Sequence, residues 1–477
     1  AEDMDPELMR MEPSLLNADS PFVALHHEVL NWLQARRQST VFDDSHLQVM
    51  FSQCKKLVER LQKRGAVVGS SLNTAYLLER LSQTLERLET LMAIFVSNRY
   101  LPRRILLLTG CFARAAAEKH SITRLWKQSS RLVSRSITQN AGDHGEHYIT
   151  RDKKEYWAMF YSAAGGGVLI ALMALFKIYL GSIIDDKVWK GIAEGLNYGL
   201  GFMVIFMLHF TVATKQPAMT AARFAEAVEK TPQGKSVNMK LAQLLVDVFR
   251  SQSIAVLGNV LIAMGLAALI AFCYQYKTGE PLMNADQIAY QLHSIDPFAG
   301  TLWFAAIAGV WLFCSGIISG YFDNRSNYLN MRMRLTQHPL LKKLMSEKSR
   351  VKFANYMHEN YGSLIGNFCF GMLLGLTGLV GYLTHLPLDI RHVAFSSANL
   401  GYSAVSGQFA YPFFLQCIAF VLLIGLVNLI VSFSLTLWVA LRSLNTEIDS
   451  WWAIWHEVCQ IVKKRPLSLF FPVQLDK

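Results

Sequence analysis

The run YPFFLQCIAFVLLIGLVNLIVSFSLTLWVAL, residues 411–441, contains no charged side chain. Because about 20 apolar residues are enough for a helix to cross the hydrocarbon core of a bilayer, this run predicts a transmembrane helix that tilts or continues beyond the membrane. Further windows of the same character precede it. Together, the predicted spans are 157–176, 196–214, 253–274, 301–320, 362–384 and 411–441.

The composition of the whole chain agrees with this interpretation. Of its 477 residues, 52% are hydrophobic and only 17% are charged, which is too apolar for an ordinary soluble protein. The formal net charge of +11 indicates either nucleic acid or the anionic cytoplasmic face of a membrane as a partner. The seven cysteines are scattered without a C-x-x-C pair, so neither a disulfide framework nor a zinc site is predicted. No metal and no cofactor are expected.

Basic residues alternate between the loops that join the predicted spans. The loops 215–251 and 323–361 carry many lysines and arginines, whereas 183–191, 275–300 and 385–410 carry one or two each. Loops rich in lysine and arginine stay on the cytoplasmic side of a membrane. The pattern therefore predicts a multi-pass membrane protein with both termini in the cytoplasm.

Small residues recur in and beside the predicted spans at spacings that let helices approach one another. Backbones without side chains gain dispersion contact, so the pattern favours a tightly packed bundle. A permeation path lined by glycines is the alternative. These positions are the run AAGGG at 163–167 and the pairs Gly195/Gly199, Gly362/Gly366 and Gly371/Gly375.

Residues 20–139 have the pattern of consecutive amphipathic helices, in which apolar side chains recur in steps of three and four. Gly65 is predicted to end one of them. The apolar positions are Leu47, Met50, Cys54, Leu57, Val58 and Leu61 in that helix and Leu72, Leu77, Leu81, Leu85, Leu88, Met92 and Phe95 in the next. The predicted fold is all-α: a cytoplasmic helical bundle at 1–150, a six-helix transmembrane domain at 151–445 and a cytoplasmic tail at 446–477.

The segment 97–137 is strongly basic, and apolar residues interleave with its charges. Placed just before the first span, it predicts a surface that lies on anionic lipid headgroups. The same charges could neutralise DNA phosphates or form a solvated face. The candidate lipid-binding residues are Arg103, Arg104, Arg114, Arg124, Lys127, Arg131 and Arg135.

The stretch HFTVATKQPAMTAA, residues 209–222, places polar residues at the cytoplasmic end of the second predicted span. Ionisable residues inside a membrane are functional candidates, and a proline there frees a helical carbonyl. The stretch is therefore a candidate gate of a membrane path, with the polar exit of a helix as the alternative. Its candidate residues are His209, Thr211, Thr214, Lys215, Gln216 and Pro217.

Residues 386–402 are too short and polar to span a membrane, and rather apolar for an exposed loop. They predict a structured loop on the periplasmic side, with a re-entrant or surface segment as the alternative. Asp389 and Arg391 could pair, and His392 could supply a titrating group. Together with Asn399, these residues form a second candidate site. A further cluster, DHGEH at 143–147, has metal-binding residue types, but its glycines indicate a loop without fixed geometry.

Five long stretches resemble a bacterial membrane family that carries the label site-specific recombinase, the gonococcal recombinase-like family. They are EHYITRDKKEYWAMFYSAAGGG (146–167), LNYGLGFMVIFMLHFTVATKQPAMTAA (196–222), SGYFDNRSNYLNMRMRLTQHPLL (319–341), LPLDIRHVAFSSANLGYS (386–403) and KKRPLSLFFP (463–472). The resemblance covers about 45–477. It implies a proteobacterial inner-membrane location, and its label implies DNA recombination.

The residues themselves favour a membrane function. Motif-rich stretches lie in or beside the predicted spans. Residues 386–403 are predicted to lie on the side of the membrane away from the cytoplasm, and DNA is not found on that side. We therefore expect a non-enzymatic protein that handles a lipid or solute, with membrane lipids rather than nucleic acid as partners. One alternative is a scaffold that recruits a cytoplasmic protein for envelope maintenance. Another is a DNA recombinase, as the family label says.

Overall fold

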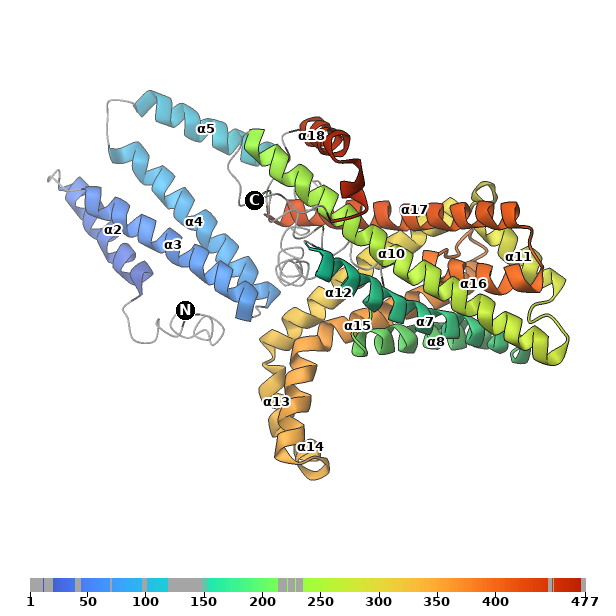
Figure 1. Cartoon of the computed structure of the whole chain (residues 1–477). Helices are drawn as coiled ribbons and strands as arrows, with labels where there is room; N and C mark the ends of the chain where they lie inside the picture. The colour runs from blue at the N-terminus through green and yellow to red at the C-terminus, as the bar shows by residue number, and fades with distance from the viewer. Residues whose placement is uncertain are drawn as a thin grey trace. The chain divides into compact units, whose positions relative to one another are not determined.

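The computed structural model describes residues 12, 20–38, 44–68, 71–96, 101–118, 149–150, 152–212, 221, 228, 235–444, 448 and 450–472 (Figure 1). All regular structure in these residues is helical, which confirms the predicted all-α class. The helices are α2 (Pro21–Arg37), α3 (Asp44–Val68), α4 (Leu72–Val96), α5 (Leu101–Glu118), α7 (Lys153–Ile183), α8 (Lys187–Met207), α10 (Lys235–Thr278), α11 (Ala285–Ile295), η6 (Pro297–Ala299), α12 (Thr301–Tyr328), α13 (Met331–Gln337), α14 (Pro339–Leu344), α15 (Glu347–Thr384), α16 (Val393–Ser406), α17 (Tyr411–Leu444), α18 (Trp451–Lys464) and η7 (Pro466–Leu469).

The chain divides into two compact units. Unit 1 holds residues 1–139 and 324–358, and unit 2 holds residues 140–323 and 359–477. The predicted C-terminal tail belongs to unit 2, where Ile454 and Val458 of α18 are buried in a cluster with residues of α10 and α17.

In unit 1, α2 packs on α3, α3 on α4 and α4 on α5. The predicted apolar stripe of α3 is correct, because Leu47, Cys54 and Val58 are all buried. In α4 the prediction was wrong at one position: Leu77 is 46% exposed, and Leu78 is buried instead. Position 78 precedes 81, 85, 88 and 92 in steps of three and four, so it continues their face of the helix. Helix α3 also runs through Gly65 to Val68.

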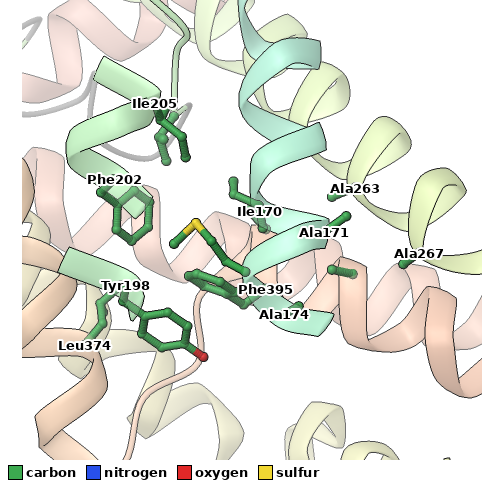
Figure 2. Packing of buried hydrophobic residues seen from close by; sticks show 14 of the residues in the cluster. Ile170, Ala171, Ala174, Tyr198, Phe202, Ile205, Ala263, Ala267, Leu374 and Phe395 are labelled. Carbon is green, nitrogen blue, oxygen red and sulfur yellow. The ribbon is translucent and has the colours of Figure 1, made fainter. Parts of the chain in front are cut away.

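In unit 2, α10 packs against α7, α16 and α18. Aromatic and small side chains interlock in its largest core, where the rings of Phe202 and Phe370 lie 4.9 Å apart. Burial of one such ring contributes about 2–3 kcal/mol. The labelled members of this core come from α7, α8, α10, α15 and α16 (Figure 2): Ile170, Ala171, Ala174, Tyr198, Phe202, Ile205, Ala263, Ala267, Leu374 and Phe395.

Among the described helices, α7, α10, α12, α15 and α17 are long and apolar enough to cross a membrane. They correspond to five of the six predicted windows. The remaining window, 196–214, does not form one continuous helix: α8 begins at Lys187 and ends at Met207. The apolar run continues beyond Met207, so hydropathy alone does not reveal this end.

Glycines allow α8 to lie close to α15. A Cβ atom added at Gly371 would collide with the backbone of Tyr198, and one added at Gly375 would collide with the backbone of Gly195. The G-x-x-x-G pair of α8 therefore meets a pair of α15, as expected for a tightly packed bundle.

Candidate functional site

A cavity of about 450 Å³ lies in unit 2 where α7 ends, α8 begins and α15 leads into α16. Helix α11 also contributes to its wall. All four residues of the second predicted site, Asp389, Arg391, His392 and Asn399, line this one cavity. Its volume is within the range of pockets that hold a small molecule or a lipid headgroup.

Residues 385–392, here called the 385–392 loop, form one wall and are bonded to α12. The indole Nε1 of Trp303 donates a hydrogen bond to the carbonyl of Pro387 (3.2 Å), and the backbone N–H of Arg391 donates to the carbonyl of Phe304 (3.2 Å). The loop begins at His385, whose φ of 56° reverses the chain after α15. These contacts give the loop a defined path.

Asn428 of α17 fixes the end of this loop. Its amide nitrogen donates to the carbonyls of Ala305 (2.7 Å) and Arg391 (3.0 Å), and its oxygen accepts the N–H of Val393 (3.1 Å). The side chain is fully buried. Since a buried amide is costly unless it is paired, this arrangement holds α12, the loop and α16 in one geometry.

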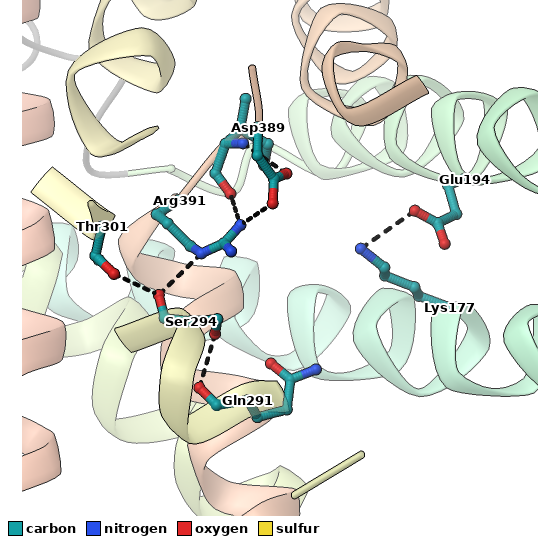
Figure 3. A network of polar contacts seen from close by, with 8 residues as sticks. Lys177, Glu194, Gln291, Ser294, Thr301, Asp389 and Arg391 are labelled. Atoms are coloured by element: carbon teal, nitrogen blue, oxygen red, sulfur yellow. Dashed lines mark hydrogen bonds and ion pairs between the residues drawn. The ribbon is translucent and has the colours of Figure 1, made fainter. Parts of the chain in front are cut away.

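Arg391 is the most connected side chain of the wall. Its Nη1 lies 2.6 Å from the Asp389 carboxylate, and its Nε donates to the carbonyl of Ser294 at 2.8 Å (Figure 3). Its guanidinium also lies 5.3 Å from the centre of the Phe304 ring. The predicted pairing of Asp389 with Arg391 is correct.

Helices α7 and α8 add a second ion pair and two further cations. Lys177 Nζ lies 3.2 Å from the carboxylate of Glu194. Lys187 Nζ lies 4.3 Å from the centre of the Tyr382 ring, and Lys190 also lines the cavity. The cavity wall therefore contains two ion pairs and two lysines beyond them.

His392 is buried between aromatic rings. The rings of Phe370, Phe395 and Phe202 have their centres 5.8, 5.9 and 6.2 Å from the imidazole. Burial in these surroundings lowers the pKa of His392 to about 3. His392 is therefore a buried member of the cavity wall whose pKa lies well below the ordinary value of a histidine.

The other predicted site has a different structure. His209 lies beyond α8, which ends at Met207. The N–H of His209 bonds to the carbonyl of Phe206 and the N–H of Phe210 to the carbonyl of Ile205, and His209 has a φ of 58°. This is the Schellman ending of a helix, with histidine at the position that glycine usually occupies.

Residues 209–212, here called the 209–212 turn, are packed against α7 and α10. Ser162 Oγ donates to the carbonyl of His209 (3.0 Å) and lies 2.9 Å from the Thr211 hydroxyl. The amide of Asn259 donates to the carbonyl of Thr211 at 2.9 Å. A Cβ atom at Gly166 would lie only 2.6 Å from that same carbonyl oxygen, so the run AAGGG makes room for the turn. Thr214, Lys215, Gln216 and Pro217 are outside the described residues.

The predicted lipid surface is described only in part. Arg103, Arg104 and Arg114 belong to α5, and Arg103 is exposed. Leu106 and Leu107 of the same helix are 72% and 63% exposed. The lipid-binding role of this helix stays a prediction. Arg124, Lys127, Arg131 and Arg135, and the cluster at 143–147, are outside the described residues.

Sequence reasoning missed part of the cavity wall. Lys177 and Glu194 lie just outside the predicted windows, and Lys187 and Lys190 were counted only as loop charges. Their signal was weak because no spacing links α7 with α8. Asn259 and Asn428 had a clearer signal, since each is an amide inside an apolar window.

The helices and cavity define an all-helical protein with several segments able to cross a membrane. A family model described as site-specific recombinase matches residues 1–472, so the chain belongs to this family. No curated protein and no solved structure matches the chain.

Proposed function

We propose that this chain is a multi-pass protein of the bacterial inner membrane that binds a lipid or solute in its cavity without changing it chemically. The cavity carries the proposal. Six charged side chains line it, and those of Arg391 and Glu194 are largely buried. Charges inside such a bundle are costly, and they usually mark a binding site or a path.

The proposal includes α8 as a sixth span. Its 21 residues give a length of roughly 30 Å, which matches a hydrocarbon core. Its glycines pack against those of α15, and its first turns line the same cavity as the end of α7. A helix that runs back along α7 accounts for both observations. Both termini are then cytoplasmic, as the loop charges predict.

A labelling experiment tests the sixth span. Asp185→Cys lies between α7 and α8, and Glu280→Cys follows α10; both parent side chains are exposed. In a cysteine-free background, an impermeant thiol reagent added to spheroplasts should label both positions. Leu344→Cys, from a basic loop, should react only after permeabilisation. If α8 does not span, positions 185 and 280 lie on opposite sides of the membrane.

The cavity wall has groups that could bind a polar ligand. Hydrogen-bonding side chains of α11 and α16, such as Gln291 and Asn399, lie near the ion pairs. The proposal confines binding to this cavity and gives the 209–212 turn a structural role.

The description of the family supplies a second candidate, DNA recombination. Recombination needs a nucleophile among cations that stabilise the reacting phosphate. Purified protein incubated with supercoiled plasmid distinguishes the candidates. Strand-exchange products would favour recombination, whereas unchanged plasmid together with a bound small molecule would favour the membrane function.

Native mass spectrometry of gently solubilised protein tests the proposed function. We expect one small molecule or lipid per chain. Gly378 lines the cavity and has room for one extra carbon, so Gly378→Leu should fill the space and release the molecule. Gly265→Leu is the matched control, because a Cβ atom there meets nothing within 4 Å. An empty wild-type protein, or equal retention by both variants, would contradict the proposal.

A further inference from the structure

We propose that the ligand carries an anionic group of the phosphate or carboxylate class, and that Lys187 and Lys190 hold it. This inference rests on the proposed function and adds the chemistry of the ligand. It comes from the balance of charges in the cavity wall and from the positions of these two lysines.

The wall has more positive than negative groups. Its cations are Lys177, Lys187, Lys190 and Arg391, and its carboxylates are Glu194 and Asp389. Each carboxylate already pairs with a cation, at 3.2 Å for Glu194 and 2.6 Å for Asp389. The wall therefore has an excess of two positive charges, which a bound anion would neutralise.

Lys187 and Lys190 have no carboxylate partner among the described residues within 4.0 Å. The nearest acid in sequence, Asp186, accepts the N–H groups of Val188 and Trp189 at 3.0 and 2.9 Å as the N-cap of α8. Its carboxylate therefore stabilises the helix start. The two lysines keep their positive charge for another partner.

Both lysines line the same cavity. Lys187 and Lys190 are three residues apart on α8, which places them on one face of the helix. The Tyr382 ring supports Lys187 through a cation–π contact at 4.3 Å, and this contact leaves N–H groups for an acceptor. Gly181 leaves space for Lys190, whose Nζ would lie 3.2 Å from a Cβ atom added there. An anion in the cavity would be attracted to both charges.

The rest of the wall indicates what else the ligand contains. Gln291, Ser294, Ser396 and Asn399 provide hydrogen-bonding groups. An anionic lipid headgroup has this chemistry, and so does a free solute with a phosphate or carboxylate. The two sources share the anion and differ in whether acyl chains are attached.

Binding measurements on the full-length protein test the anion. Inorganic phosphate is titrated onto protein in phosphatidylcholine nanodiscs as the free-anion probe. Nanodiscs with and without phosphatidylglycerol provide the lipid probe, and thermal stabilisation is the readout. At least one probe should stabilise the wild-type protein, and the effect should fall as salt concentration rises. The probe that stabilises the protein identifies the source.

Lysine variants test the assignment. Lys187→Gln/Lys190→Gln should weaken binding at least about tenfold, because each lysine contributes a charge-assisted hydrogen bond. Lys187→Arg/Lys190→Arg should retain most of it. Lys277→Gln is the matched control, since this lysine ends α10 and does not line the cavity. Equal binding by the wild-type and Gln variants, or no stabilisation by either probe, would overturn the inference.

The proposed function does not require the ligand to be an anion. A neutral molecule that native mass spectrometry finds in wild-type protein, and that Gly378→Leu releases, would support the proposed function and contradict the anion. If nothing is retained and neither probe binds, both fail.

Discussion

The 209–212 turn and the 385–392 loop look alike in sequence, because both are polar segments beside apolar runs. In the structure, each is bonded to the amide of a buried asparagine: Asn259 bonds to the first and Asn428 to the second. The two segments differ in whether their side chains line a cavity. The hydroxyl of Thr211 and the carbonyls of His209 and Thr211 bond to α7 and α10, whereas side chains of the loop line a cavity.

From this difference we propose that a dense group of polar residues is not in itself a binding site. Polar groups at the end of a helix must find partners, and a tight turn finds them within the protein. A site arises where the backbone bonds fix a segment and its side chains remain directed into a cavity. The predictions below test this distinction.

The largest effects are expected at the two asparagines. Asn428→Ala and Asn259→Ala should each destabilise the protein by roughly 2–4 kcal/mol, because each leaves buried backbone groups unpaired. Only Asn428→Ala should also weaken ligand binding, since only Asn428 fixes the cavity wall. Thermal unfolding and native mass spectrometry of both variants measure the two effects. Equal loss of the ligand in both variants would remove the distinction between the two segments.

Helix α8 joins the two regions, and its contact with α15 should be sensitive to volume. Gly371→Ala should cost roughly 1–3 kcal/mol, because its Cβ atom meets the backbone of Tyr198. Gly265→Ala should be neutral or stabilise the protein by about 1 kcal/mol through helix propensity. Unfolding of both variants in one detergent makes the comparison. A stable Gly371→Ala variant would contradict the close contact of the two helices.

Substitution of His209 separates a helix-ending role from a gating role. His209→Gly should be neutral or slightly stabilising, because glycine adopts a positive φ without strain. His209→Val should lose about 1–2 kcal/mol, because a β-branched residue fits that conformation poorly. Both variants should bind the ligand like the wild type. Loss of ligand binding in His209→Gly would instead support the predicted gating role of His209.

The last expected effect, a pH dependence at His392, develops only on acidification. An unfolded histidine takes up a proton near pH 6.5, whereas the pKa of His392 in the folded protein is lowered to about 3. Its contribution to stability is present above pH 6.5 and is lost as the pH falls from there towards 3. His392→Phe, which suits the surrounding rings, should therefore lose less stability on acidification than the wild type. Identical pH profiles would show that His392 does not have this lowered pKa.

Much of this architecture follows from the sequence. Apolar length predicted five of the long helices, and steps of three and four predicted the core of α3, because each pattern acts within one helix. The segment 386–402 was also predicted as a candidate site, since Asp389, Arg391 and His392 are close in sequence, and these residues line the cavity. Its composition, which is too polar for a span and rather apolar for an exposed loop, identified this segment as a candidate.

Other features depend on contacts that no local pattern encodes. The end of α8 at Met207 depends on a left-handed histidine and on Ser162 of another helix. The pairing of Lys177 with Glu194 joins two helices, so neither residue indicates the other. Leu77 and Leu78 are equally apolar and precede Leu81 by four and three residues, so the spacing to Leu81 alone does not decide which of them is buried.

A density map of the full-length protein in nanodiscs made from native membranes tests the central claim most directly. We expect density for a bound molecule in the cavity beside Lys187, Lys190 and the 385–392 loop, and a 209–212 turn packed against α7 and α10. An empty cavity, or a molecule bound at the 209–212 turn, would contradict the account.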